Sequence, residues 1–263
     1  MSRSRTLLAL AVQPSQSMIG IFTADELVEH WRVATDVRRT ADDWGLLVSS
    51  LVDQTGCGAV DAVSVCSAVP TVLPELRAMA ASHFPAADLV VVGPGVRTGL
   101  SLLMDNPREV GTDRITNAVA ALELFGAPCV VVDLGAATTF DVLDERSQYV
   151  GGAIAAGPRI SMEALSQHGA QLRQVELTAP RSVIARNTVE ALQSGTVFGA
   201  VAQVDGMVAR IVEELGPSVA QDVSVVATGS AAPGFVEHCR SVNAYEPWLL
   251  LHGLALIHRR SLG

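Results

Sequence analysis

The sequence predicts an α/β protein built from two similar half-domains that enclose a cleft. Short apolar runs with strand character alternate with segments of helical periodicity along the 263 residues. Hydrophobic residues make up 49% of the chain but aromatic residues only 4%, so we expect a core of Ala, Val and Leu around buried strands. Residues 7–22 and 129–144 also share one pattern of apolar strand, turn and apolar strand, which indicates an internal duplication.

The two similar stretches read LLALAVQPSQSMIGIF and CVVVDLGAATTFDVLD. Superposing them pairs Ala11 with Asp133 and Gln13 with Gly135, so the second turn carries an acid and a glycine that the first lacks. Two unrelated buried hairpins would give a similar match by chance, since short apolar strands resemble one another. The strands and helices that follow each copy favour a duplication.

Each further element follows from a local period of two for strands or 3.6 for helices. In the first half, strands are expected within 26–33, 59–69 and 88–96, and helices within 42–54 and 71–83. In the second half, strands are expected within 147–157 and 222–230, and helices within 161–172, 187–216 and 248–260. A helix at 114–126 is the expected hinge, so the half-domains are predicted to span residues 1–115 and 116–263.

Composition and charge exclude several classes of partner. The formal net charge of −9 and the lack of a basic run argue against nucleic acid. No run reaches the ~18 apolar residues of a membrane span, and the short apolar start is interpreted as the first strand rather than a signal peptide. The histidines show no metal-ligand spacing. The cysteines show no C-x-x-C spacing, which predicts reduced thiols and a cytoplasmic protein: Cys57, Cys66, Cys129 and Cys239.

The second hairpin turn has the residue types of a phosphate site. Asp133 ends an apolar strand, Gly135 allows close approach of a ligand to the backbone, and Thr138 and Thr139 add hydroxyl groups. Similar Asp-x-Gly turns occur in plain hairpins, where they only shape the turn.

A second group of polar residues surrounds the start of the expected hinge helix. The loop GPGVRTGL at 93–100 carries Arg97, which is predicted to meet an anionic substrate, although a surface arginine in a glycine-rich turn would look the same. In DNPREVGTDRITNAVAA at 105–121, Asp113 and Arg114 precede an apolar helix, which places both charges at a helix N-terminus. The alternative is that Asp113 only caps the helix.

These motifs, together with GGAIAAGPRISMEAL, RNTVEALQSGTVFG and VVATG in this order, resemble the type III pantothenate kinases, also called the Bvg accessory factor family. The resemblance covers nearly the whole chain. It implies the duplicated actin-like ATPase fold and a homodimer with substrate pockets at its interface. It also implies transfer of a phosphoryl group from ATP to the hydroxyl of pantothenate, the first step of coenzyme A biosynthesis, with Mg²⁺ and a monovalent cation, K⁺ or NH₄⁺.

The resemblance also implies roles for individual residues. Asp113 resembles the general base, and Asp133 matches the carboxylate that holds the monovalent cation. The implied pantothenate contacts are Gly111, Thr112, Arg114 and Thr188. The implied nucleotide and phosphate contacts are Ser15, Ser17, Gly135, Ala136, Thr138 and Thr139.

The nucleotide side departs from the family pattern. Where the family has a D-x-G-N-T turn, this chain has Ala11-Val12-Gln13-Pro14-Ser15, which lacks the acid, and Pro14 lacks a backbone N–H. Ala136 stands where the family commonly has a hydroxyl residue. We therefore expect a kinase with an impaired nucleotide loop. The alternatives are a pseudokinase that only binds pantothenate, a subunit of a heteromer with an active paralogue, and an enzyme acting on another small hydroxy acid.

Overall fold

The computed structural model describes residues 5–169 and 172–261, and its contacts divide the chain into two units. Unit 1 contains the described residues up to Leu100, Asn106–Ala120 and those from Leu249 onward. Unit 2 contains Ser101–Asp105 and Ala121–Trp248. The expected division after residue 115 stays a prediction; the contacts divide the hinge helix after Ala120 and add the C-terminal helix to unit 1.

Unit 1 contains a five-stranded sheet in the order β3-β2-β1-β4-β5. The central strand β1 pairs antiparallel with β2 and parallel with β4. Strands β2 and β3 are antiparallel, and β4 and β5 are parallel. The bounds are β1 Thr6–Val12, β2 Gln16–Thr23, β3 Glu26–Ala34, β4 Ala62–Ser67 and β5 Asp88–Val91.

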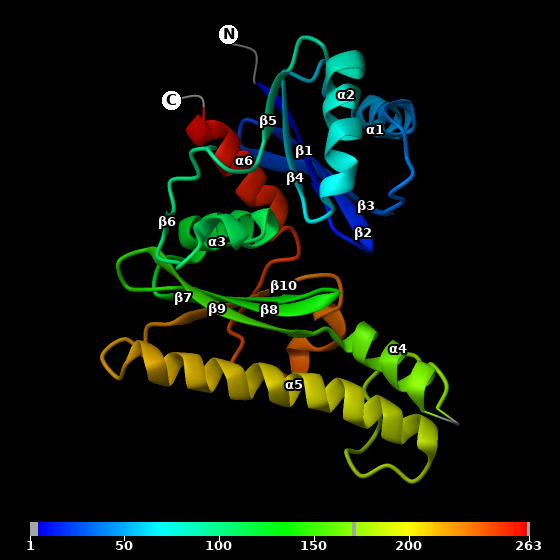
Figure 1. The fold of residues 1–263 in the computed structure, drawn as a ribbon, viewed down its shortest axis with the longest axis vertical. Coiled ribbons are helices and arrows are strands. Elements are labelled where there is room, and N and C mark those ends of the chain that lie inside the picture. The colour runs from blue at the N-terminus through cyan, green and yellow to red at the C-terminus, as the bar shows by residue number, and fades with distance from the viewer. Residues whose placement is uncertain (1–4, 170–171, 262–263) are drawn as a thin grey trace. The chain divides into compact units, whose positions relative to one another are not determined.

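Helices cover both faces of this sheet because its central strands are apolar on both sides (Figure 1). On one face lie α1, Ala41–Thr55, and α2, Leu73–His83, which bring Trp44 and Met79 into the core. A reciprocal capping box of Thr40 and Asp43 starts α1. On the other face lies α6, Leu249–Ser261, and the Ser64 hydroxyl of β4 donates a hydrogen bond of 3.0 Å to the Leu254 carbonyl oxygen.

Unit 2 contains a six-stranded sheet in the order β11-β10-β7-β8-β9-β6. Its central strand β7 pairs antiparallel with β8 and parallel with β10, while β8 and β9 are antiparallel. The bounds are β6 Ser101–Leu102, β7 Cys129–Leu134, β8 Ala137–Leu143, β9 Gln148–Ala156, β10 Ser224–Thr228 and β11 Ala244–Tyr245.

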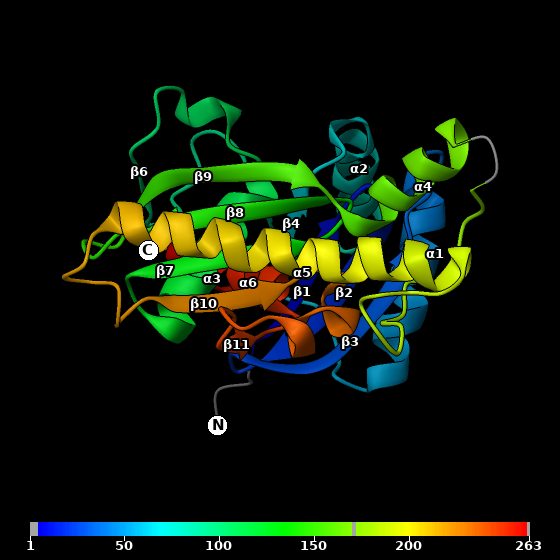
Figure 2. The same ribbon diagram turned by 90° about the horizontal axis from the view of Figure 1, so that it is seen from below.

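The long helix α5, Thr188–Leu215, covers one face of this second sheet (Figure 2). Its valines, among them Val197 and Val204, pack against Val132 and Phe140 of the sheet. By length and composition alone α5 is long and apolar enough to cross a membrane. The valines of α5 pack in the core of unit 2, and this packing explains why the helix is apolar. The shorter α4, Pro158–His168, lies beside it.

The two sheets confirm the expected duplication, because β3-β2-β1-β4-β5 and β9-β8-β7-β10-β11 have the same order and the same strand directions. The expected helices are also confirmed, with shifted ends. The helix expected at 161–172 starts earlier, at Pro158, because proline is favoured in a first turn, and it ends at His168. Residues 170 and 171 of that prediction lie outside the described residues. The two-residue strands β6 and β11 were not expected from the sequence.

Candidate functional site

The first turn of α3, Thr112–Phe125, is fixed to the end of strand β4. The Thr112 hydroxyl donates a hydrogen bond of 3.2 Å to the Ser67 carbonyl oxygen, and the Thr116 hydroxyl donates one of 2.6 Å to the Thr112 carbonyl oxygen. Asp113 is therefore the second residue of a helix whose start is held in place. Its carboxylate also lies within reach of the positive end of the helix dipole.

Gly111 leaves room for the Asp113 carboxylate. A Cβ atom at Gly111 would lie 2.6 Å from Asp113 Oδ1, so a larger residue would displace the carboxylate. Asp113 and Arg114 are both half-buried, which leaves part of each side chain accessible. Gly111, Thr112, Asp113 and Arg114 are thus consecutive residues of one formed turn. Asp113 is the second residue of the helix and does not precede it, so Asp113 does not occupy the N-cap position.

Cys66 of β4 lies beside this turn and is fully buried. Burial is the main cause that raises the pKa of its thiol, and the negative charge of Asp113 raises it further, against a smaller opposing effect of the hydrogen bond with Thr116. The thiol therefore stays protonated and provides a neutral neighbour for Asp113.

Ala11, where the family pattern has an acid, lies next to Cys66. The two residues are paired across the parallel strands β1 and β4, and the neighbour of Ala11 on its other side is Met18 of β2. Ala11 is fully buried. Ala11 therefore lies on the same face of the sheet as the Cys66 thiol, which lies beside the first turn of α3.

The turn between β1 and β2 is closed by hydrogen bonds to Thr35. The Thr35 hydroxyl donates to the Gln13 carbonyl oxygen at 2.7 Å, and the Thr35 N–H donates to the Ser15 carbonyl oxygen at 3.4 Å. Since the only hydroxyl proton of Thr35 goes to Gln13, the Ser17 hydroxyl is the donor in its 2.8 Å contact with Thr35 Oγ1. Ser17 is buried, whereas Ser15 is exposed at the tip of the turn. Their phosphate contacts stay predictions.

The turn between β7 and β8 contains Asp133 and the glycines around it, and its phosphate and cation contacts stay predictions. Asp133, at the end of β7, is paired directly with Thr139 of β8. Glycines enclose the Asp133 carboxylate: a Cβ at Gly229 would overlap Oδ1, and one at Gly135 would lie 3.3 Å from it. In the described part of the chain no group of three His, Cys, Asp or Glu residues could hold a metal ion.

The remaining residues of this turn differ in exposure. Thr139, Gly135 and Ala136 are partly exposed, whereas Thr138 is buried on the opposite side of β8, the side of Phe140 and the α5 core. Gly157 lies so close to the turn that a Cβ there would overlap the Ala136 carbonyl oxygen. Thr139 is therefore the threonine of this turn that a ligand reaches more easily.

Arg97 belongs to unit 1 and Thr188 to unit 2. Arg97 is exposed and lines a cavity of about 550 Å³ together with Asp88 and Ser261. Thr188 is the exposed first residue of α5 in unit 2, after the N-cap Asn187, whose side chain accepts a hydrogen bond from the Glu190 N–H. Their predicted contacts with substrate are not tested by this geometry.

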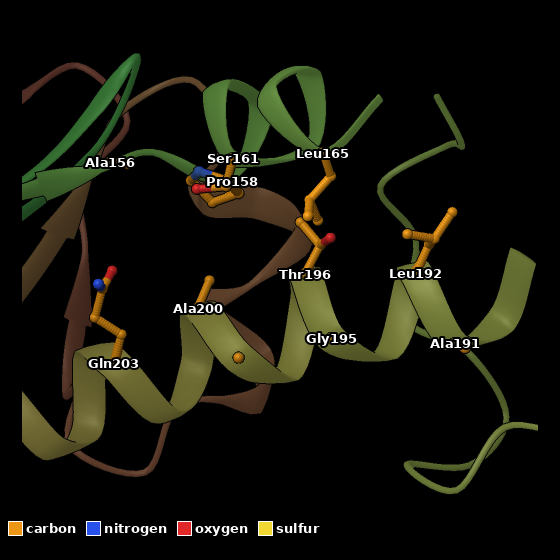
Figure 3. A pocket seen from close by; sticks show the side chains of 11 residues that line it. Ala156, Pro158, Ser161, Leu165, Ala191, Leu192, Gly195, Thr196, Ala200 and Gln203 are labelled. Atoms are coloured by element: carbon orange, nitrogen blue, oxygen red, sulfur yellow. The ribbon is translucent and has the colours of Figure 1, made fainter. Parts of the chain in front are cut away.

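A groove between α4 and α5 was not expected from the sequence (Figure 3). It has a volume of about 350 Å³, and Leu165 of α4 and Thr196 of α5 point toward one another across it. Small residues line much of the α5 side, with Ala191, Gly195 and Gly199 at intervals of four beside the larger Leu192 and Gln203. This interval is the signal that could have predicted an open helix face.

Comparisons with known proteins place the fold and the family. A sequence model of the family described as type III pantothenate kinase matches residues 7–210. Type III pantothenate kinases from Nocardioides sp. (strain JS614) and Thermobifida fusca are 52% and 51% identical, each over 97% of this chain and 99% of the relative. The ROK hexokinase from Thermus thermophilus superposes with a TM-score of 0.53 at 13% identity, over 96% of this chain and 98% of that chain. The structure therefore has the actin-like ATPase fold. Within that class, the chain belongs to the type III pantothenate kinase family.

Proposed function

We propose that this chain is an ATP-dependent pantothenate kinase with an impaired first phosphate loop, acting at the first step of coenzyme A synthesis. The observation that carries this proposal is a contrast within unit 1. The Asp113 turn is formed and Gly111 leaves room for its carboxylate, whereas a buried methyl group at Ala11 replaces the acid of the family pattern. Family membership supports pantothenate as acceptor and ATP as donor.

On the acceptor side, Asp113 accepts the proton of the pantothenate hydroxyl while the hydroxyl oxygen attacks the γ-phosphorus of ATP and ADP leaves. Arg114 is the next residue, and its guanidinium pairs with the pantothenate carboxylate. Gly111 and Thr112 line the same substrate. Thr188 and Arg97 provide further contacts in this proposal.

On the donor side, the first loop does not fit a magnesium ion. Magnesium prefers carboxylate and water oxygens, but Ala11 offers a methyl group and Pro14 has no N–H for the phosphates. Thr35 also holds the carbonyl oxygens of Gln13 and Ser15. The exposed Ser15 hydroxyl is the remaining phosphate contact at the tip of this loop.

The second loop fits a monovalent cation better. The Asp133 carboxylate lies between Gly135 and Gly229, where a side chain would occupy the space next to Oδ1. Such a cation would neutralise part of the phosphate charge. This proposal assigns the phosphate contacts of the second loop to the backbone at Gly135 and Ala136, because the Thr139 hydroxyl donates its proton to Asp141.

Restoring the first loop tests the proposal. Losing one preorganised electrostatic contact typically lowers kcat by about 10²–10³-fold, so the double substitution Ala11→Asp with Pro14→Asn is expected to raise kcat by at least ~10²-fold. Pro14→Asn alone is the matched control, because it restores the N–H without the acid. Adding Asp113→Asn to the double variant is expected to remove the gained activity.

Calorimetry then identifies the weak step. We expect pantothenate to bind the unaltered chain and Mg²⁺-ATP to bind weakly. Tight Mg²⁺-ATP binding together with a kcat unchanged by the double substitution would contradict the impaired-loop proposal. Loss of pantothenate binding in the unaltered chain would contradict the acceptor site.

The burial of Ala11 also favours a second candidate, a pseudokinase that binds pantothenate alone or as a subunit of a heteromer with an active paralogue. Formation of ADP separates the two. The pseudokinase gives no pantothenate-dependent ADP, and a heteromeric subunit gives ADP only after the paralogue is added.

The exposed apolar residues of unit 2 support a homodimer. Ile184 and Val183 are 85% and 66% exposed, close in sequence to the α5 face of Ala191, Gly195 and Gly199. We expect a dimer by light scattering and a monomer after Ile184→Asp. Free thiols at the four cysteines are consistent with the proposed cytoplasmic location.

A further inference from the structure

A buried carboxylate lies on the face of the second sheet that is opposite α5. Side chains alternate along β8, so Thr138 and Phe140 face the α5 core while Thr139 and Asp141 face the other side. Asp133 of β7 is paired directly with Thr139, and directly paired residues share a face. Asp133, Thr139 and Asp141 therefore form one polar row on this face.

Each oxygen of the Asp141 carboxylate accepts a hydrogen bond from a hydroxyl group. Tyr149 donates to Oδ1 at 2.6 Å, and Thr139 donates to Oδ2 at 3.1 Å. Asp141 and Tyr149 are fully buried. A buried carboxylate is costly unless hydrogen bonds satisfy it, and these two donors supply that stabilisation.

The bond to Asp141 determines how Thr139 can interact with a ligand. A threonine hydroxyl has one proton, and this proton is directed at Asp141. The Thr139 oxygen therefore presents only lone pairs to its remaining surroundings. Thr139 is partly exposed and is paired with Asp133 across the two strands, so two oxygen-bearing side chains are neighbours on this face. Such oxygens are suited to a hard cation.

We propose that Asp141 is a positioning residue, which fixes the Thr139 hydroxyl as an oxygen ligand for a monovalent cation next to Asp133. Tyr149 donates to the other oxygen of Asp141 and stabilises the buried charge. The proposal rests on the proposed cation site at Asp133. It adds a ligand, Thr139, and a buried partner that orients it.

The substitution Asp141→Asn tests the orientation with little change in shape. The amide NH₂ of asparagine donates to Thr139, so the threonine proton turns outward, toward the position of the cation. Altering a partner behind a metal ligand typically weakens affinity about 10–100-fold, and we expect the apparent Kd for K⁺ to rise by at least ~10-fold. Thr139→Val removes the ligand and is expected to abolish the K⁺ response.

The readout is the rise in Tm on titration with KCl at constant ionic strength, with choline chloride as the balancing salt. Binding to the native state raises Tm with K⁺ concentration, and the midpoint of the response gives the affinity without any need for turnover. Tyr149→Phe keeps the Thr139 bond, so its midpoint is expected to stay within about threefold of the unaltered chain.

Asp144→Asn is the control for stability on the same hairpin. The Asp144 carboxylate accepts hydrogen bonds from the Arg146 and Gln148 N–H groups in the turn after β8. This substitution is expected to lower Tm without moving the K⁺ midpoint. A purely structural role of Asp141 would give the same result for Asp141→Asn.

Equal K⁺ midpoints for the unaltered chain and Asp141→Asn would overturn the proposal. So would a chain whose Tm does not respond to K⁺ beyond its response to choline. Calorimetry with pantothenate on the same samples separates the two levels: retained pantothenate binding without a K⁺ response means that this inference fails while the acceptor site stands.

Discussion

The hydroxyl of Thr112 donates a hydrogen bond to the carbonyl oxygen of Ser67, which joins the first turn of α3 to the end of β4. The two residues are 45 positions apart in the sequence. This contact sets the position of the turn that carries Asp113 relative to the sheet. The proposed proton acceptor is therefore positioned by a strand that carries no residue of its own in the proposed reaction.

Replacing Thr112 with valine removes this bond with little change in shape. Loss of one such hydrogen bond typically costs about 1 kcal/mol, so we expect pantothenate affinity to fall about fivefold. Calorimetry measures this change. Thr55→Val is the matched control, because the Thr55 hydroxyl donates to the Val52 carbonyl oxygen in α1, and it is expected to change stability but not affinity. Equal losses of affinity in both variants would contradict the positioning role of Thr112.

Gly253 allows α6 to pack closely against α3. A Cβ at Gly253 would overlap the Thr116 carbonyl oxygen, so Gly253→Ala is expected to lower the free energy of unfolding by at least ~2 kcal/mol. Gly206→Ala is the control within α5, where a Cβ would meet no atom within 4 Å. Alanine is favoured over glycine in helices by about 0.5–1 kcal/mol, so this variant is expected to be more stable. Urea denaturation measures both, and a neutral Gly253→Ala would disprove the close packing.

His258 is expected to make unit 1 less stable at acidic pH. Burial is the main cause that lowers its pKa below the ordinary 6.5, with Arg5 lowering it further and Asp88 acting in the opposite sense. The unfolded chain therefore takes up a proton at His258 before the folded chain does. The free energy of unfolding should fall as pH drops through 6.5 and level off below the folded-state pKa.

The substitution His258→Gln removes this titration. We expect the difference in unfolding free energy between the unaltered chain and the variant to change with pH only around and below 6.5. Urea denaturation across this range measures it. Parallel pH profiles for the two proteins would show that His258 does not contribute.

The cysteines are expected to differ in reactivity. Burial raises the pKa of Cys129 to about 12, and burial together with Asp205 raises that of Cys239 to about 11. Burial also raises that of Cys66. Since the thiolate is the reactive form, a disulfide reagent at about pH 8 should leave Cys66 and Cys129 unmodified in the native protein. Mass spectrometry of labelled peptides checks this, and all four cysteines should react in urea. Rapid native labelling of Cys66 would contradict its burial.

The fold was predictable from the sequence because the apolar patterns are strong. The spacing of the valines in α5 predicts a helix, and the alternation of residues along β8 predicts a strand. The repeated hairpin pattern predicts the duplication. The short strands β6 and β11 could not be predicted in this way, since two residues carry no period and depend on neighbouring strands for their pairing. The assignment of α6 to unit 1 depends on contacts with distant strands, such as that of Ser64 with Leu254.

The candidate site was predictable only where residue type carries the chemistry. Asp113 and Gly111 could be singled out because they stand together at the start of a periodic helix. Asp141 is buried with a hydrogen bond from Tyr149 of the next strand, and its proposed role depends on which face of β8 it shares with Thr139. Neither feature is contained in a short motif. Thr35 closes the turn between β1 and β2 only because β3, which precedes Thr35, pairs with β2. A short motif does not show this pairing.

The helix α6 completes unit 1 from the far end of the sequence. A ribosome therefore finishes everything up to Trp248 before the helix that covers this face of β1 and β4 exists. During translation the strand face around Gly20 and Ser64 stays exposed until α6 has been synthesised. Unit 1 therefore cannot complete its folding before the residues of unit 2 have been synthesised. Nascent chains that stall before Leu249 should accordingly be retained by chaperones, however well their earlier strands have paired.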